Sequence, residues 1–168
     1  MTTLIAYASK HGSTESIAER IAERLRAAGR EVELIHTDEL PEDLSRFEDV
    51  VLGCPIYATN WHRKGVHAVR ERGEALKAAN RLWVFSVGGG PTITQPAVEI
   101  ARPLAPREHA YLRGALEPAK LGFIERQVIR GAKAKTGDFR DWDAIDAFAD
   151  RIARNAPLSG PAADATGE

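Results

Sequence analysis

The sequence has very little cysteine: Cys54 is the single thiol in 168 residues. One thiol cannot form an internal disulfide, which excludes a disulfide-stapled secreted scaffold and favours a reducing compartment. An excess of charge is also missing, because 23 Lys and Arg residues face 24 Asp and Glu residues, for a formal net charge of -1. A general nucleic-acid binder would carry a strongly basic surface, so we expect no nucleic-acid partner.

Long apolar runs are missing as well. The longest uncharged stretch, residues 82–98, contains three consecutive glycines at 88–90 and prolines at 91 and 96. These residues exclude a membrane-spanning helix there. Residues 1–9 lack the basic leader of a secretory signal. We therefore expect a cytoplasmic protein, with peripheral contact at the inner face of the membrane as the only form of membrane association.

Short apolar runs alternate with segments of helical periodicity. Runs typical of buried strands lie at residues 3–8, 31–36, 49–53, 81–87 and 108–116. Helical spacing marks residues 13–28, 62–79, 95–104, 119–134 and 142–153. Strands separated by helix-sized segments form parallel βαβ units with right-handed crossovers, which place helices on both faces of one sheet. The sequence thus predicts an α/β fold, a doubly wound five-stranded parallel sheet of order 2-1-3-4-5 within residues 1–155, followed by a flexible tail at 156–168.

The segment between the first strand and the first helix is rich in hydroxyl groups. It reads Ser9, Lys10, His11, Gly12, Ser13 and Thr14. Free backbone N–H groups and the helix dipole favour an anion at a helix N-terminus, and a glycine allows the backbone to approach it closely. The alternative is that Ser13 or Thr14 only caps the helix. Capping does not explain the whole group, so we predict a phosphate site here.

Several other phosphate-handling classes do not fit this segment. Neither G-x-G-x-x-G nor G-x-x-x-x-G-K-[ST] follows the first strand, which excludes the dinucleotide and nucleoside-triphosphate fingerprints. A phosphoacceptor domain needs acidic residues at the ends of the first and third strands, where the sequence reads Ala8-Ser9 and Gly53-Cys54. A cysteine phosphatase needs a thiolate in the loop, and none is present.

Residues 9–14 resemble the phosphate loop of the flavodoxin family, which binds flavin mononucleotide (FMN). The family pattern is hydroxyl-x-hydroxyl-Gly-x-Thr, matched by Ser9, Gly12 and Thr14, while His11 departs from the second hydroxyl. The resemblance extends over roughly residues 2–155. Within the family the chain is most similar to the menaquinone-dependent protoporphyrinogen IX dehydrogenase branch, through residues 7–14, 113–116, 123–129 and 141–142.

This resemblance implies an FMN-dependent oxidoreductase that oxidises protoporphyrinogen IX and passes electrons to a quinone. The sequence does not distinguish FMN from a deazaflavin as the cofactor, and it identifies no side chain as a catalytic acid or base. One alternative is an electron carrier that docks on redox-protein partners without a substrate of its own, and another is a non-redox module that binds a phosphate ligand. Carriers of the family are strongly acidic, whereas this chain is nearly neutral, which favours the enzyme.

The resemblance also implies two further loops beside the isoalloxazine ring of the flavin. The first follows the third strand, and its cofactor-binding candidates are Pro55, Ile56, Tyr57, Ala58, Asn60 and Trp61. Tyr57 or Trp61 would stack on the ring, and the alternative is that both aromatic side chains pack beneath the loop. The second follows the fourth strand and consists of Ser86, Val87, Gly88, Gly89 and Gly90, where a plain glycine turn is the alternative. No aromatic side chain stands in the second loop, which would leave one ring face to a substrate.

The helix predicted at residues 119–134 indicates what kind of surface the protein could contact. Residues 119–135 carry five positive side chains and one negative, and apolar residues recur at three- and four-residue spacing. Such a helix either docks its apolar side on the sheet or lies at an anionic membrane surface, where a quinone is available. The five histidines show no ligand spacing, so no metal site is expected. The sequence does not indicate an oligomeric state.

Overall fold

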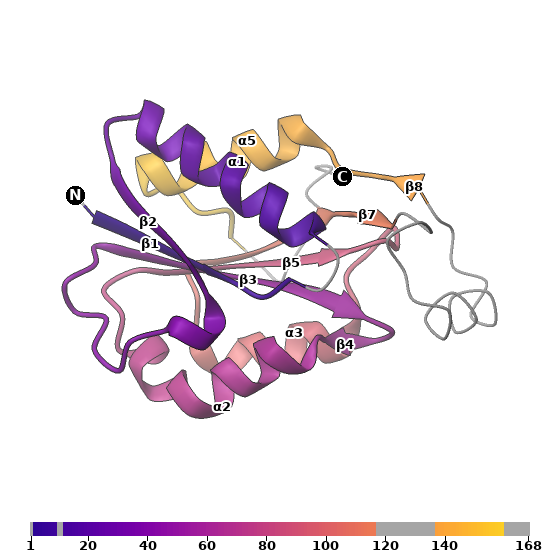
Figure 1. The fold of residues 1–168 in the computed structure, drawn as a ribbon, viewed down its shortest axis with the longest axis horizontal. Coiled ribbons are helices and arrows are strands. Elements are labelled where there is room, and N and C mark those ends of the chain that lie inside the picture. Colours follow the sequence, from indigo (N-terminus) through magenta and orange to yellow (C-terminus); the bar gives the residue numbers. More distant parts are fainter. Residues whose placement is uncertain (1, 10–11, 117–136, 160–168) are drawn as a thin grey trace.

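A computed structural model describes residues 2–9, 12–116 and 137–159 (Figure 1). Its centre is a parallel sheet with the strand order β2-β1-β3-β5-β6, which confirms the predicted order of the five strands. The strands are β1 (Thr2–Tyr7), β2 (Glu31–His36), β3 (Asp49–Tyr57), β5 (Leu82–Gly88) and β6 (Glu108–Arg113). The strands β1, β3 and β5 have neighbours on both sides, and most of their side chains are buried.

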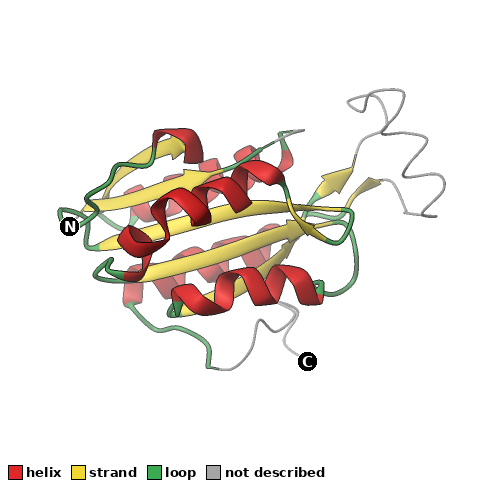
Figure 2. Ribbon diagram, turned by 90° about the horizontal axis from the view of Figure 1, so that it is seen from below, coloured by secondary structure: helices red, strands yellow, loops and turns green. Residues whose placement is uncertain are grey.

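Helices cover both faces of the sheet, as predicted (Figures 1 and 2). One face carries α1 (Ser13–Ala27) and α5 (Trp142–Arg154), and the other carries α2 (Arg63–Lys77) and α3 (Gln95–Ala101). Two short 3-10 helices, η1 (Thr37–Glu39) and η2 (Arg102–Leu104), follow β2 and α3. None of the helices in the described ranges is long and apolar enough to cross a membrane.

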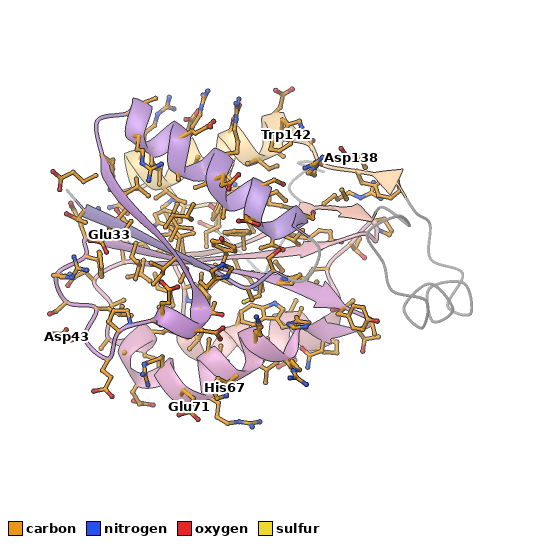
Figure 3. All side chains as sticks on the ribbon, in the orientation of Figure 1. Glu33, Asp43, His67, Glu71, Asp138 and Trp142 are labelled. Atoms are coloured by element: carbon orange, nitrogen blue, oxygen red, sulfur yellow. The ribbon has the colours of Figure 1, made fainter. Side chains whose placement is uncertain are left out.

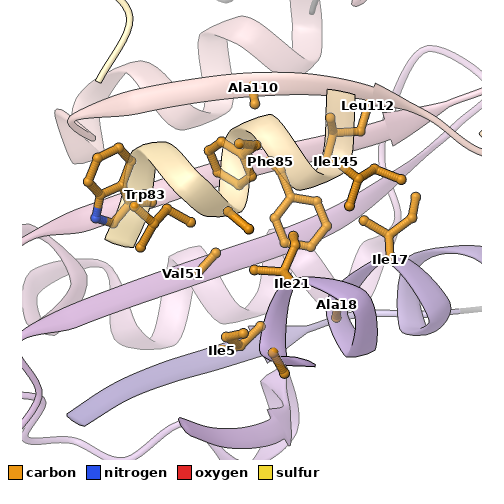
Figure 4. Packing of buried hydrophobic residues seen from close by; sticks show 14 of the residues in the cluster. Ile5, Ile17, Ala18, Ile21, Val51, Trp83, Phe85, Ala110, Leu112 and Ile145 are labelled. Carbon is orange, nitrogen blue, oxygen red and sulfur yellow. The ribbon is translucent and has the colours of Figure 1, made fainter. Parts of the chain in front are cut away.

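The two faces bury separate hydrophobic clusters. Successive strand residues point to opposite faces, so Ile5 contributes to the cluster under α1 and α5, while Leu4 contributes to the cluster under α2 and α3. Helix α1 supplies Ile17 and Ile21 at helical spacing, and Figure 4 shows them in one cluster with Ile5, Val51 and Phe85. Helix α5 begins as its sequence predicts, because the side chain of its N-cap, Asp141, accepts a hydrogen bond from the backbone N–H of Ala144 at 3.1 Å.

Some predicted boundaries were wrong. Residues 54–57, expected in a loop, continue β3, because Ile56 and Tyr57 pair with the antiparallel strand β4 (Asn60–Trp61). The predicted strand 108–116 divides at Gly114, after which β7 (Ala115–Leu116) pairs with β8 (Gly137–Asp138). The predicted helix 95–104 ends at Ala101 and continues only as the 3-10 helix that contains Pro103. The predicted helix 119–134 lies outside the described residues.

A buried carboxylate organises the edge of the sheet at which the parallel strands begin. Asp49 begins β3 with no exposed surface and accepts hydrogen bonds from Arg81 Nε and Trp83 Nε1, each at 2.8 Å, and from Arg30. Arg30 also donates to the carbonyl of Ala153 at 2.8 Å, which links the sheet to the end of α5. Burial pushes the pKa of Asp49 up, but these hydrogen bonds outweigh it, and the pKa lies below its usual value.

Replacing Asp49 tests this arrangement. Asp49→Ala leaves two guanidinium groups without their carboxylate, and removal of one partner from a buried ion pair typically costs about 3–5 kcal/mol. We expect the free energy of unfolding in urea to fall by about that amount. Glu42→Ala, at an exposed acidic position, is the control and should stay within about 0.5 kcal/mol of the unsubstituted protein. A loss below about 1 kcal/mol for Asp49→Ala would contradict the role given to this residue.

Candidate functional site

The segments predicted to bind the cofactor meet at one edge of the sheet. Parallel strands bring their carboxyl ends together, and in Figure 1 the ends of β3, β5 and β6 point the same way. Backbone hydrogen bonds join neighbouring segments: the N–H of Ala8 donates to the carbonyl of Gly53 at 2.9 Å, and that of Gly114 donates to the carbonyl of Gly88 at 2.9 Å. Because Pro55 of β3 also pairs with Val87 of β5, these segments are continuous from β1 to β6.

The turn before α1 has the features of an anion site. Gly12 is the N-cap of the helix, with a φ of 84° that glycine adopts without strain. Neither Ser13 nor Thr14 is the cap, and no side chain at the cap position accepts from the first N–H groups of the helix. The N–H of Gly12 instead donates to Ser9 Oγ at 3.0 Å, which shapes the turn. Lys10 and His11 lie outside the described residues.

The chemistry of this turn fits a phosphate group. The positive end of a 15-residue helix faces the turn, and the hydroxyl of Ser9 lies beside the N–H of Gly12, the N-cap of that helix.

A carboxylate and a phenol pair next to this turn. The carboxylate of Glu15, in the first turn of the helix, accepts from the hydroxyl of Tyr7 at 3.2 Å. Burial and the charge of Glu15 raise the pKa of Tyr7 to about 12, so this phenol stays protonated and keeps donating to Glu15.

A contact that the sequence did not indicate holds Ser13. Its Oγ accepts a hydrogen bond from the N–H of Ala115 at 2.8 Å, so the hydroxyl that was predicted to meet phosphate also fixes the start of β7. Gly114 makes this possible, because a Cβ there would lie 2.6 Å from both Ser13 Oγ and Val87 Cγ1. A glycine inside a predicted strand is the signal that marks such a close approach.

The two aromatic residues of the hairpin formed by β3 and β4 differ in burial. Trp61 is 3% exposed, and its indole N–H donates to Ser86 Oγ at 2.8 Å inside the core. Tyr57 is half-buried at the end of β3. Ala58, which follows it, has a φ of 59°, a left-handed conformation that is unusual for a residue with a side chain. The side chain of Asn60 accepts from the N–H of Trp61 at 2.7 Å.

Residues 86–90, which we call the glycine segment, span the end of β5 and the turn after it. Gly89 and Gly90 are exposed, whereas Ser86, Val87 and Gly88 lie buried in the strand. Two side chains of β6 hold the exposed part. Tyr111 donates to the carbonyl of Gly90 at 2.7 Å, and Arg113 donates to that of Gly89 at 3.2 Å. Neither β6 residue was predicted to take part, because nothing in their spacing points to this segment.

The residue that precedes α3, its N-cap Thr94, also contacts the hairpin. The hydroxyl of Thr94 donates to the carbonyl of Thr59, at the tip of the hairpin, at 2.7 Å. The start of α3 is therefore in contact with the hairpin, and the hydrogen bond from Trp61 to Ser86 joins the two predicted segments themselves.

The margin of the site towards α5 carries an ion pair. Arg140 donates to Asp138 Oδ2 at 2.6 Å and to Ser16 Oγ at 2.9 Å, so the end of β8 is held against α1. Hydrogen bonds from Arg140 lower the pKa of Asp138 to about 2. Figure 3 shows Asp138 and Trp142 close to each other at this margin, away from His67 on α2. Within the described ranges no group of three or more His, Cys, Asp or Glu side chains is arranged to hold a metal ion.

His109 of β6 provides a pH test of the core beneath the site. Burial lowers its pKa from 6.5 to about 4, so the unfolded chain binds more protons than the folded one between these values. The stability this neutral imidazole contributes is present above pH 6.5 and is lost as the pH falls towards 4. At ~1.4 kcal/mol per pKa unit the loss is on the order of 3 kcal/mol.

Urea unfolding at several pH values between 7 and 4 measures this loss. We expect His109→Gln to remove most of the slope, whereas His67→Gln, at an exposed histidine, should keep it. Equal slopes in the two variants would show that His109 is not the titrating group.

Comparisons with known proteins agree with this architecture. A sequence profile of the flavodoxin domain matches residues 4–143. None of the curated proteins matches. Among solved structures, a flavodoxin from the domain Archaea superposes with a TM-score of 0.64 at 15% identity, covering 93% of this chain and 99% of that one. The flavodoxin of Streptococcus pneumoniae gives 0.64 at 14% identity over 92% and 99% of the two chains.

Oxidised Flavodoxin 1 from Bacillus cereus gives a TM-score of 0.58 at 14% identity, covering 95% of this chain and all of that one. At such identities these likenesses show the fold, while the profile match spans well over half of the sequence. With a domain match over most of its length and the strand order of the fold, the chain belongs to the flavodoxin family.

Proposed function

We propose that the protein binds FMN at the carboxyl edge of its sheet and acts as an electron-transfer protein of flavodoxin type. The observation that carries this proposal is the uncapped N-terminus of α1, which lies at the same edge as the β3–β4 hairpin and the glycine segment. One end of this site suits a dianionic phosphate, and the other offers an aromatic side chain and exposed backbone amides.

Each part of the site would have a defined task. The N–H groups at the start of α1, with the hydroxyls of Ser9 and Ser13, would hold the phosphate. Tyr57 is the better candidate for stacking on the ring, because Trp61 is buried and its indole N–H is engaged with Ser86. The backbone of Gly89 and Gly90 would bond the edge of the ring. When bound, FMN supplies the redox chemistry, and these residues bind and orient it.

Binding of two flavins that differ only in the phosphate tests these tasks. Ser9→Ala should weaken FMN about tenfold and leave riboflavin unchanged, because it removes the acceptor that shapes the phosphate turn. Tyr57→Ala should weaken both flavins about tenfold or more, because stacking on an aromatic contributes ~1–3 kcal/mol. Quenching of flavin fluorescence on titration with the flavin-free protein measures both effects.

Ser45→Ala is the matched control for Ser9→Ala, since Ser45 is exposed and lies just before β3, at the opposite edge of the sheet. It should bind both flavins like the unsubstituted protein. Equal losses for FMN and riboflavin in Ser9→Ala would place Ser9 away from the phosphate. An unsubstituted protein that binds no flavin overturns the proposal.

A second candidate function is oxidation of protoporphyrinogen IX with a quinone as acceptor. It is favoured by residues 113–116, which resemble that branch of the family and which lie beside the glycine segment and the start of α1. The basic stretch at residues 119–135 would then bring the protein to an anionic membrane surface. The electron carrier ranks first because the similar structures reported above are flavodoxins.

Anaerobic turnover separates the two functions. For a carrier we expect rapid electron exchange between the FMN-loaded protein and a flavoprotein reductase, with no steady oxidation of protoporphyrinogen IX in the presence of a soluble quinone. Visible absorbance of the flavin and porphyrin fluorescence follow the two processes. Steady formation of protoporphyrin that depends on both the protein and the quinone would reverse the ranking.

A further inference from the structure

Two buried side chains and one half-buried side chain form a hydrogen-bond chain beneath the hairpin. The indole Nε1–H of Trp61, on β4, donates to Ser86 Oγ of β5 at 2.8 Å, and this oxygen lies 2.7 Å from His109 Nε2 of β6. Trp61 is 3% exposed and Ser86 is fully buried. The rings of Trp61 and His109 meet edge to face, with centroids 6.2 Å apart. The chain therefore connects the short strand of the hairpin to two strands of the main sheet.

The direction of each hydrogen bond follows from the chemistry of the groups. An indole N–H only donates, so Ser86 Oγ accepts from Trp61. The direction of the second hydrogen bond depends on the imidazole tautomer. We assign the tautomer with the proton on Nδ1, in which Ser86 donates its single hydroxyl hydrogen to His109 Nε2. The burial that lowers the pKa of His109 to about 4 keeps the imidazole in this neutral form near pH 7.

The pairing within the hairpin is weak, so the hydrogen-bond chain matters for holding the hairpin against the sheet. Its two strands share only the pairs Ile56–Trp61 and Tyr57–Asn60, and a two-stranded hairpin of this size is marginal in water. Its turn also contains Ala58 in the left-handed conformation, which costs roughly 1–3 kcal/mol. Backbone pairing of β3 with β5 reaches Pro55, and beyond that residue side-chain contacts with the sheet add to the weak pairing of the hairpin.

A polar chain suits this task better than apolar packing. Apolar side chains of similar volume would bury as well, often with greater stability, but they do not select one orientation. A fully satisfied hydrogen-bond chain has one geometry, and every group that leaves it loses a partner inside the core. Trp61 pairs directly with Ile56 across the hairpin, so the position of the indole determines the position of the adjacent Tyr57.

We propose that Ser86 and His109 are positioning residues for the flavin ring, acting through Trp61 on the hairpin that carries Tyr57. This inference rests on the proposed FMN function and deepens it. Ser86 is fully buried, so it would act through the indole and not by contact with the cofactor, and His109 would act through Ser86.

Three variants separate positioning from general stability. His109→Leu and Ser86→Ala each break the chain, whereas His109→Gln offers an amide oxygen that can still accept from Ser86. We expect the two breaking variants to bind both FMN and riboflavin about tenfold more weakly and to alter the visible circular dichroism of the bound flavin. His109→Gln should resemble the unsubstituted protein in both measurements.

The flavin-free protein supplies an independent measurement. Trp61, Trp83 and Trp142 each give an indole N–H resonance, and they differ in environment, because Trp83 donates to Asp49 and Trp142 is 39% exposed. In Ser86→Ala and His109→Leu only the Trp61 resonance should shift by more than a few tenths of a ppm. If His109→Leu does not fold, the smaller change Ser86→Ala gives the same comparison.

The outcomes are distinct. If the Trp61 resonance stays in place in the breaking variants, the chain does not exist in solution. If it shifts while flavin affinity and circular dichroism remain unchanged, the chain is only structural, and the positioning role is overturned. If the unsubstituted protein binds no flavin, the proposed function fails and this inference with it.

Discussion

The burial of β3 on both faces is the constraint on which the rest of the structure depends. Val50, Val51 and Leu52 are completely buried between the two helix layers, so their backbone groups can be satisfied only by neighbouring strands. Strands β1 and β5 provide these partners in parallel register. Parallel pairing then sends every carboxyl end to the same edge, where the segments of the candidate site meet.

The two ends of β3 have different tasks. At its start, Asp49 joins β5 and the end of α5 through buried charged hydrogen bonds, which lock the sheet to one helix layer. At its end, the strand passes beyond the sheet into a hairpin with two residue pairs and an exposed tip. The stable end supports the fold, and the weakly paired end lies where a ligand would be held. Rigid scaffolds commonly carry functional segments of lower intrinsic stability in this way.

Side chains from β5, β6 and α1 compensate for the weak pairing at this edge. Ser13 of α1 holds β7, Tyr111 and Arg113 of β6 hold the glycine segment, and Ser86 of β5 holds the hairpin through Trp61. The near-neutral net charge does not decide between carrier and enzyme, because net charge governs the steering of partners and not the chemistry of a site.

The sequence by itself determined the layered fold, the strand order and the turn at residues 9–14, because buried strands, amphipathic helices and glycine at a helix start leave local signals. It did not show that β3 runs on into a hairpin, nor which of Tyr57 and Trp61 is buried, because both residues have the same character in the sequence. Ser86 was predicted in the second loop, but only the tertiary structure showed its contact with His109 and the contact of Ser13 with Ala115 beside Gly114. These contacts join residues 23 to 102 positions apart, and side-chain pairing over such separations has no periodic or local signature in the chain.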